Sequence, residues 1–263
     1  MILMNQTLSS PLTIHPLPGI PEIRPGDDLV AHLLDAMRDA GLALAEGDVI
    51  VVAQKVVSKA EGSRAALADV KPRPWAQRWA ERWGKDARQV ELVLRESRRI
   101  VRAERGILVS ETRHGFVCAN AGVDLSNSGA RDVAVLLPED PDRSARLLRQ
   151  ELLERTGRAA GVIVADSFGR PWRHGLTQVA LGVAGMTPVA DLRGQADTEG
   201  RPMHVTQIAL ADELASAADL VCGKTARIPA ALIRGAPCVA RTPDPGPGSG
   251  ADLLRPAEQD LFR

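Results

Sequence analysis

Cysteine, net charge and long apolar runs are all scarce in this chain of 263 residues. Its three cysteines lie far apart without a CxxC pair, which gives no zinc motif and indicates reduced thiols in a cytoplasmic protein. The 33 basic residues balance 33 acidic ones, so the basic excess of nucleic-acid and membrane-surface binders is missing. No apolar run approaches the ~20 residues of a membrane helix, and the N-terminus lacks the pattern of a signal peptide. We expect a soluble cytoplasmic protein that binds neither nucleic acid nor membranes.

Several short catalytic and nucleotide-binding motifs are absent as well. The GKT at 223–225 would need a glycine at position 218 to form a phosphate loop, and that residue is Ala218. The GPGSG at 246–250 follows a Pro-rich connector and not a strand, so a dinucleotide fingerprint is excluded. Neither GxSxG nor HExxH occurs. Any nucleotide or metal chemistry must therefore come from a less common arrangement.

The apolar periodicity predicts a mixture of helices and short strands. Helices are expected over 28–40, near 142–156, around 206–219, and over 74–104 with a break at Gly84. Strands are expected in 12–24, early in 47–62, at 161–165, and as a hairpin over 107–120 that turns at His114-Gly115. Because short, hairpin-linked strands alternate with grouped helices, we predict an α+β fold with mixed or antiparallel sheets.

Two side-chain patterns on the long helical stretch allow simple structural explanations. Trp75, Trp79 and Trp83 share one helix face, which favours core or subunit packing over a ligand platform. The arginines between 95 and 105 lie among glutamates, which favours a solvated face over a phosphate-binding track. There is no internal repeat. We predict one module over 12–241, built as two interleaved subdomains, with a Pro/Gly connector and C-terminal helix over 242–263 belonging to it.

Polar residues follow a buried strand at 165–175, which reads ADSFGRPWRHG. An acid and a hydroxyl, Asp166 and Ser167, stand side by side there, and three basic residues follow, Arg170, Arg173 and His174. Further oxygen donors lie in two other polar segments, Asp124 with Asn127 and Asp191 with Asp197. Carboxylates and hydroxyls suit Mg²⁺ or Mn²⁺, while each aspartate alone is more typical of a turn or helix cap. Both interpretations stay open at this level.

Five stretches in fixed order resemble the coenzyme F420-0:gamma-glutamyl ligase family. They are GDVIVVAQKVVSKAEG (47–62), ANAGVDLSNS (119–128), VIVADSFGRPWRHG (162–175), DLRGQADTEGR (191–201) and ADELASAADLVCGK (211–224). The resemblance runs from about Ile14 to the final DLFR. It implies an α+β homodimer that uses GTP, Mg²⁺ or Mn²⁺, and a monovalent cation such as K⁺ to join L-glutamate to the phospholactyl carboxylate of F420-0. Some relatives carry a nitroreductase-like domain fused at the C-terminus, and we expect the stand-alone form here because the chain ends too early to contain one.

The resemblance assigns roles to individual residues. It implies metal ligands at Asp124 and Asp166 for a first cation and at Ser167 for a second. From the chemistry of the expected reaction, we add catalytic roles for Lys59, Asp166 and Arg170, and Arg173 and His174 are candidates for holding substrate. Nucleotide contacts would be made by Ile20, Pro21, Glu22, Ile23, Gln54, Lys59, Asn127, Cys222, Gly223, Lys224 and Thr225.

One position departs from the family pattern. Archaeal members have a second-metal glutamate where this chain has Lys224, and a protonated lysine cannot ligate a cation. We hypothesise that the Lys224 charge instead contacts phosphates, in which case Lys224→Ala must reduce GTP turnover. The expected chemistry is phosphoryl transfer from GTP to the acceptor carboxylate, followed by attack of the glutamate amine on the acyl phosphate. Alternatives are a ligase of this fold for another carboxylate and a non-catalytic nucleotide-binding homologue.

Overall fold

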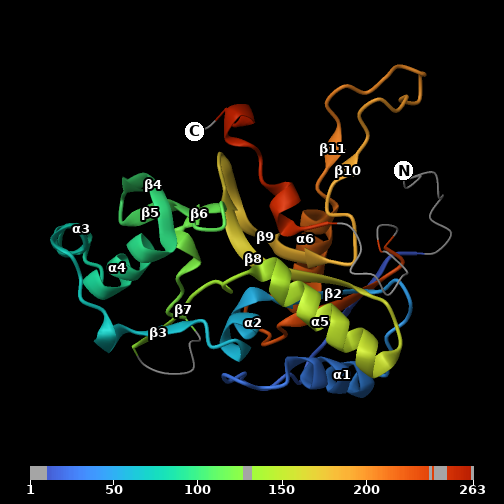
Figure 1. The fold of residues 1–263 in the computed structure, drawn as a ribbon, viewed down its shortest axis with the longest axis horizontal. Helices are drawn as coiled ribbons and strands as arrows, with labels where there is room; N and C mark the ends of the chain where they lie inside the picture. The colour runs from blue at the N-terminus through green and yellow to red at the C-terminus, as the bar shows by residue number, and fades with distance from the viewer. Residues whose placement is uncertain (1–10, 127–131, 237–238, 240–247, 262–263) are drawn as a thin grey trace.

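The computed structural model describes residues 11–126, 132–236, 239 and 248–261, which form the predicted α+β fold. Its central sheet has five strands in the order β1-β12-β2-β8-β9 (Figure 1). β2 and β8 run parallel, and the other neighbouring pairs are antiparallel. The strands are β1 (Thr13–Pro16), β12 (Ala230–Arg234), β2 (Val49–Ala53), β8 (Gly161–Arg170) and β9 (Arg173–Ala184). Segments from both ends and the middle of the chain therefore meet in one sheet.

Helices cover both faces of this sheet, and for this reason its inner strands are apolar on both sides. On β2, Ile50 and Val52 join one hydrophobic core, while Val49 and Val51 join another on the opposite face. The first core is closed by α1 (Leu29–Asp39), α2 (Gln54–Ala60) and α5 (Pro141–Thr156), and the second by α6 (Leu210–Cys222).

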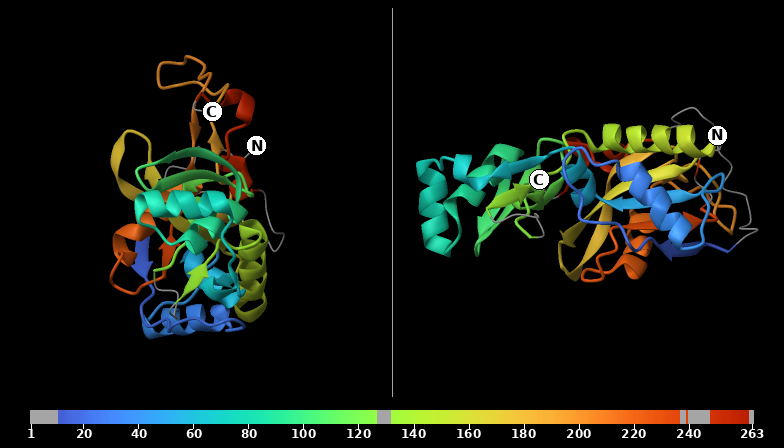
Figure 2. Two further views of the ribbon diagram at one scale, coloured as in Figure 1. Left: turned by 90° about the vertical axis from the view of Figure 1, so that its left-hand side faces the viewer. Right: turned by 90° about the horizontal axis from the view of Figure 1, so that it is seen from below.

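A second group of elements lies beside the central sheet and has a hydrophobic core of its own (Figures 1 and 2). Its sheets are β3-β7 and β4-β5-β6. Trp79 packs against this core and stacks on the exposed Trp75 with ring centroids 6.2 Å apart, so the predicted core packing is confirmed for Trp79. The elements are β3 (Arg64–Ala66), η1 (Leu67–Asp69), α3 (Pro74–Trp83), α4 (Ala87–Glu96), β4 (Ser97–Glu104), β5 (Ile107–Thr112), β6 (Val117–Ala119), η2 (Asn120–Gly122) and β7 (Val133–Val135).

The remaining elements are short. β10 (Ala190–Asp191) and β11 (Gln207–Ile208) pair at the base of a long extension, and two 3-10 turns, η3 (Gly250–Leu253) and η4 (Ala257–Gln259), stand where the C-terminal helix was predicted. η3 is attached to the main body because the Gly250 N–H donates to Asp142 of α5 over 2.7 Å. Within the described residues, no helix is both long and apolar enough to cross a membrane.

The prediction of a helix over residues 74–104 was wrong for the last eight residues. The break at Gly84 is confirmed, with φ 60, but the second helix ends at Glu96 and residues 97–104 form β4. Pairing with β5 overrides the helical pattern predicted for this arginine-rich segment. The arginines do lie among acids: Arg99 binds the buried Glu111 over 2.6 Å, and Arg102 binds Glu104.

The strand predicted at 161–165 is also longer than its apolar run. β8 continues through Arg170 because β9 pairs with it along its whole length, and residues 171–172 make the turn. Asp166 and Ser167 are therefore strand residues and do not belong to a loop after the strand. The predicted interleaved subdomains and homodimer stay predictions.

Candidate active site

The site begins where the two parallel strands of the central sheet end side by side. Ala53 of β2 is the register partner of Ala165 of β8, so Gln54 and Asp166 follow at the same edge. The carboxyl ends of parallel strands are common positions for ligand sites. A register shift in β9, opposite Val164 and Ala165, adds a bulge next to Asp166. The α2 helix starts at this edge and carries Gln54, Lys55 and Lys59.

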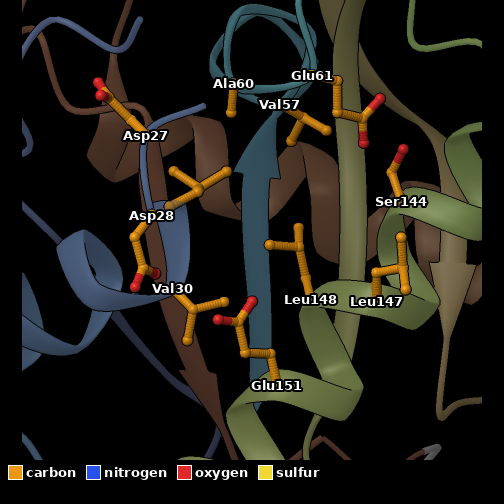
Figure 3. A pocket seen from close by; sticks show the side chains of 11 residues that line it. Asp27, Asp28, Val30, Val57, Ala60, Glu61, Ser144, Leu147, Leu148 and Glu151 are labelled. Carbon is orange, nitrogen blue, oxygen red and sulfur yellow. The ribbon is translucent and has the colours of Figure 1, made fainter. Parts of the chain in front are cut away.

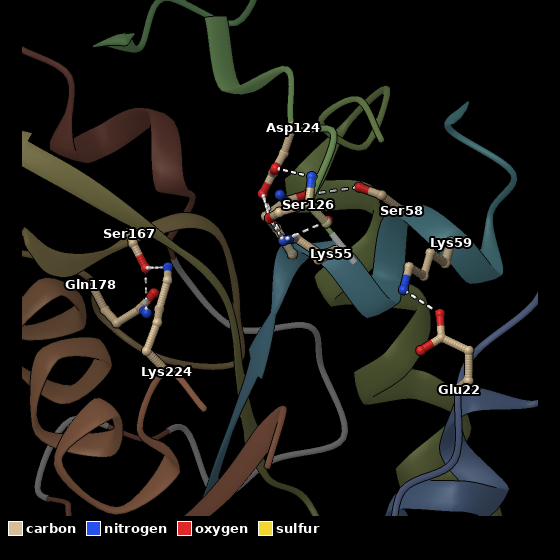
Figure 4. A network of polar contacts seen from close by, with 10 residues as sticks. Glu22, Lys55, Ser58, Lys59, Asp124, Ser126, Ser167, Gln178 and Lys224 are labelled. Atoms are coloured by element: carbon tan, nitrogen blue, oxygen red, sulfur yellow. Dashed lines mark hydrogen bonds and ion pairs between the residues drawn. The ribbon is translucent and has the colours of Figure 1, made fainter. Parts of the chain in front are cut away.

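Asp124 reaches this edge from the segment after η2 and binds an ammonium group (Figure 4). Its carboxylate accepts from Lys55 Nζ over 2.6 Å and from the Ser126 backbone N–H and hydroxyl over 2.6 and 2.9 Å. Burial by itself raises the pKa of Asp124, but the hydrogen bonds from Lys55 and Ser126 outweigh it and the net pKa is lowered. Asp124 is therefore held as a carboxylate.

Asp166 has a different environment. Burial raises its pKa to about 6, and the nearby Asp124 carboxylate adds to this, while the Ser167 N–H and the charges of Lys224 and Lys55 oppose it. Among the described residues, no ion pair joins Asp166 to a basic side chain. The electrostatic effects nevertheless connect Asp124, Asp166, Lys55 and Lys224, four side chains from four separate segments. The structure thus brings together the two predicted carboxylates.

Ser167 lies beside Asp166 and receives two hydrogen-bond donors. Lys224 Nζ is 3.0 Å from its Oγ, and Gln178 Nε2, from the facing strand β9, is 2.9 Å from the same atom (Figure 4). Gln178 Nε2 also donates to Asp219 of α6 over 3.2 Å. The side chain of Gln178 therefore links β8, β9 and the last turn of α6, after which Lys224 follows.

Lys59 forms a third polar centre on the same helix. Its side chain is only 4% exposed and pairs with the exposed Glu22 over 2.5 Å, while Gln54 is buried and accepts from Ser58 over 2.8 Å. Glu22 belongs to the predicted nucleotide segment 20–23. Ile23, by contrast, is buried in the main core, so only its backbone could contact a ligand.

A family profile described as F420-0:Gamma-glutamyl ligase matches residues 19–235 of the chain. Curated relatives named "Coenzyme F420:L-glutamate ligase" extend over nearly the same length. That of Methanothermobacter thermautotrophicus is 47% identical over 93% of this chain and 96% of its own. Those of Methanopyrus kandleri and Methanocaldococcus jannaschii are 45% and 42% identical, over 96% and 83% of this chain and 98% and 85% of their own.

The chain belongs to the F420-0:gamma-glutamyl ligase family.

In this member of the gamma-glutamyl ligase family, the other predicted site residues are more scattered. Arg170, Arg173 and His174 lie at the exposed tip of the β8–β9 hairpin, where Arg170 donates to the His174 carbonyl over 3.2 Å. Cys222 ends α6 and Gly223 caps it with φ 62, which leaves Lys224 and Thr225 exposed at the start of the next loop. Ile20 and Pro21 lie before Glu22 in the segment between β1 and α1, and Asn127 lies outside the described residues.

The acidic pair in the 191–201 segment has a turn role in this family member. Asp191 pairs with Arg193, whose hydrogen bond lowers the pKa of Asp191 to about 2. Asp197 accepts from the Arg201 N–H over 2.8 Å and closes its own turn. These contacts match the turn interpretation of the two aspartates.

A pocket of about 320 Å³, apart from the site residues described above, is lined by residues of α1, α2 and α5 (Figure 3). Apolar side chains such as Val57 and Leu148 line it together with four acids, Asp27, Asp28, Glu61 and Glu151. Arg155 neutralises Asp28 and Glu151. Burial raises the pKa of Glu61. None of the described residues that line the pocket is basic, so it offers no positive charge to the phosphates of the nucleotide that the family resemblance implies.

Proposed function

We propose that this chain is a GTP-dependent ligase that adds L-glutamate to the phospholactyl carboxylate of F420-0, through an acyl phosphate and with release of GDP and phosphate. The observation that carries the proposal is the convergence of Asp124, Asp166, Lys55 and Lys224 at one sheet edge, in a chain of this family. Carboxylates for a cation beside ammonium groups for phosphates are what phosphoryl transfer needs. The names of the relatives supply the substrate.

The described residues fit one divalent cation. Asp166 is buried, which raises its pKa, and among the described residues it has no basic ion-pair partner. Asp124 lies close enough to raise that pKa further. Mg²⁺ is commonly held by one or two carboxylates, with water and substrate phosphates completing its shell. This agrees with the absence, among the described residues, of any cluster of three or more His, Cys, Asp or Glu side chains. When bound, Mg²⁺ or Mn²⁺ would supply positive charge to the triphosphate. We also propose that K⁺ assists the reaction as a monovalent cation.

The chain's own residues would divide the remaining work. Lys59, which is held by burial and by Glu22, would contact the nucleotide phosphates together with Gln54. Lys224 would neutralise charge on the transferred phosphoryl group from the Ser167 side. Ammonium groups held by tertiary contacts need little reorganisation as negative charge shifts, which favours the transition state.

The exposed hairpin tip suits the anionic substrates. Arg170 ends β8, the strand that carries Asp166, and Arg173 and His174 begin β9 after the turn. Guanidinium groups bind carboxylates and phosphodiesters well, so we assign these basic residues to binding of the acceptor or the incoming glutamate.

We also propose that two protomers form a dimer, to be checked by light scattering during size exclusion.

The proposal is tested by incubating the protein with GTP, Mn²⁺, L-glutamate and F420-0. A glutamylated deazaflavin product and an equivalent amount of GDP are expected by mass spectrometry. GDP without that product would indicate a different carboxylate acceptor. No nucleotide turnover in any condition would indicate a binding protein without ligase activity.

A further inference from the structure

The hydroxyl of Ser167 is already fully used as an acceptor in this structure. A serine Oγ has two acceptor lone pairs. One faces Gln178 Nε2 at 2.9 Å and the other Lys224 Nζ at 3.0 Å. A divalent cation could therefore bind this oxygen only if one of the two donors left.

The orientation of the Gln178 side-chain amide follows from its second partner, Asp219. Its side-chain nitrogen also lies 3.2 Å from Asp219, and a carboxylate only accepts, so the amide NH₂ and not the carbonyl must point to this side. The same amide ties the last turn of α6 to β9. Lys224 follows that turn after Gly223, whose positive φ redirects the chain. The contact between Gln178 and Asp219 and the turn at Gly223 therefore determine where the Lys224 ammonium lies.

The acids of the site are too few for two divalent cations. Asp124 and Asp166 can hold one, and the described residues contain no third His, Cys, Asp or Glu that would form a cluster with them. At Ser167 a second cation would find one neutral oxygen and, next to it, an ammonium of like charge. The nearby Asp219 carboxylate accepts from Gln178 Nε2, which lies between it and Ser167. Hard divalent cations are held by carboxylates and water and are repelled by ammonium groups.

We propose that the Lys224 ammonium takes the place of a second divalent cation at Ser167, so that each protomer uses one divalent cation. The inference rests on the proposed GTP-dependent reaction, in which Lys224 would contact the transferred phosphoryl group directly. It makes Lys224 a catalytic residue and Gln178 the positioning residue that holds it near Ser167 through Asp219 and α6. The dependence of turnover on metal concentration is then hyperbolic.

The test is a Mn²⁺ titration followed by the electron paramagnetic resonance signal of free Mn²⁺, with and without a non-hydrolysable GTP analogue. We expect one Mn²⁺ per protomer in the wild type. Lys224→Glu is expected to bind two, because it removes the ammonium and adds a hard oxygen ligand. Lys71→Met, which removes an exposed lysine outside the site, is the matched control and is expected to bind one.

Two Mn²⁺ per wild-type protomer, with or without the analogue, would overturn the inference. Lys224→Ala should also lower kcat for GTP turnover roughly 10- to 100-fold, the effect of one charge-assisted hydrogen bond, and unchanged turnover would contradict it equally. Gln178→Glu and Gln178→Leu separate positioning from folding: both should lower kcat more than they change KM for GTP, with unchanged far-UV circular dichroism. Failure of the ligase proposal would be visible separately, as one bound Mn²⁺ without any glutamylated product.

Discussion

The carboxylate of Asp142 joins three parts of the fold, and its removal is expected to destabilise all three. It lies in the first turn of α5 and accepts from the backbone N–H of Val183 in β9 over 2.8 Å. It also accepts from the N–H of Gly250 over 2.7 Å and from the hydroxyl of Ser249. Val183 is fully buried, so no water can replace the lost acceptor of its N–H. We therefore predict a large loss of stability for Asp142→Ala.

The magnitude follows from the number and kind of bonds. A hydrogen bond to a charged acceptor contributes about 1.5–3 kcal/mol, and the buried N–H of Val183 falls in this range. The two bonds to the C-terminal segment are partly solvated and add about 1 kcal/mol together. The acidic side chain at the helix N-terminus adds about 0.5 kcal/mol. The sum is a loss of about 3–4.5 kcal/mol in the free energy of unfolding, and Asp142→Asn, which keeps one acceptor, should lose about half of this.

Urea unfolding followed by circular dichroism measures the free energy, and amide hydrogen exchange locates the change. The exchange of the Val183 and Gly250 amides should accelerate in Asp142→Ala. Asp35→Ala is the matched control, because Asp35 makes only an exposed ion pair with Arg38 and should lose under about 1 kcal/mol. A loss below about 1 kcal/mol in Asp142→Ala, or unchanged exchange at Val183, would refute the reasoning.

Three further predictions concern packing, the nucleotide and pH. Gly182→Ala would place a Cβ 2.0 Å from the Pro141 carbonyl oxygen and 2.3 Å from its carbon, so α5 must move away from β9. The free energy of unfolding, measured with urea, should fall by about 3 kcal/mol or more. Gly169→Ala, with open space around it, should be nearly neutral, and equal losses in the two variants would contradict this account. Lys59→Met should raise the Kd for GTP roughly 10- to 100-fold by calorimetry, because the buried ammonium is lost, and a Kd within about threefold of the wild type would count against its assignment. The hydrogen bonds from Arg155 and the Ala31 N–H lower the pKa of Asp28, so its ionised form stabilises the fold above the usual carboxyl pKa, and this contribution is lost as the pH falls through the lowered value. The stability difference between the wild type and Asp28→Asn should therefore shrink on acidification, and a difference that does not change with pH would contradict it.

The elements with strong local signals could be predicted from the sequence. The helices at 29–39 and 141–156 and the turn at Gly115 follow from apolar spacing, caps and a glycine with φ 97. The β4 strand could not be predicted, because its arginine-rich sequence becomes a strand only through pairing with β5. The extension of β8 past its apolar run depends likewise on β9, whose first four residues are exposed. Long-range strand pairing decides both cases.

The candidate site divides in the same way. Asp124, Asp166, Ser167 and Lys224 were recognised through motifs in the chain, and the structure gathers them at one sheet edge. The sequence assigned no role to Gln178 or to Asp219, although Asp219 lies in the stretch 211–224, since a glutamine in a strand and an aspartate in a helix are common surface residues. Their contact with Ser167 depends on the β8–β9 register and on where α6 ends. Lys55 stood in a polar run after a strand, and only the fold shows that it binds Asp124.

The ligase assay with and without Asp166 tests the central claim most directly. Wild-type protein with GTP, Mn²⁺, L-glutamate and F420-0 should form the glutamylated deazaflavin and GDP in equal amounts. Asp166→Asn, which keeps the shape of the side chain and removes its charge, should lower both rates together by at least about 100-fold. GDP formation without glutamylated product in the wild type, or full activity in Asp166→Asn, would contradict the account.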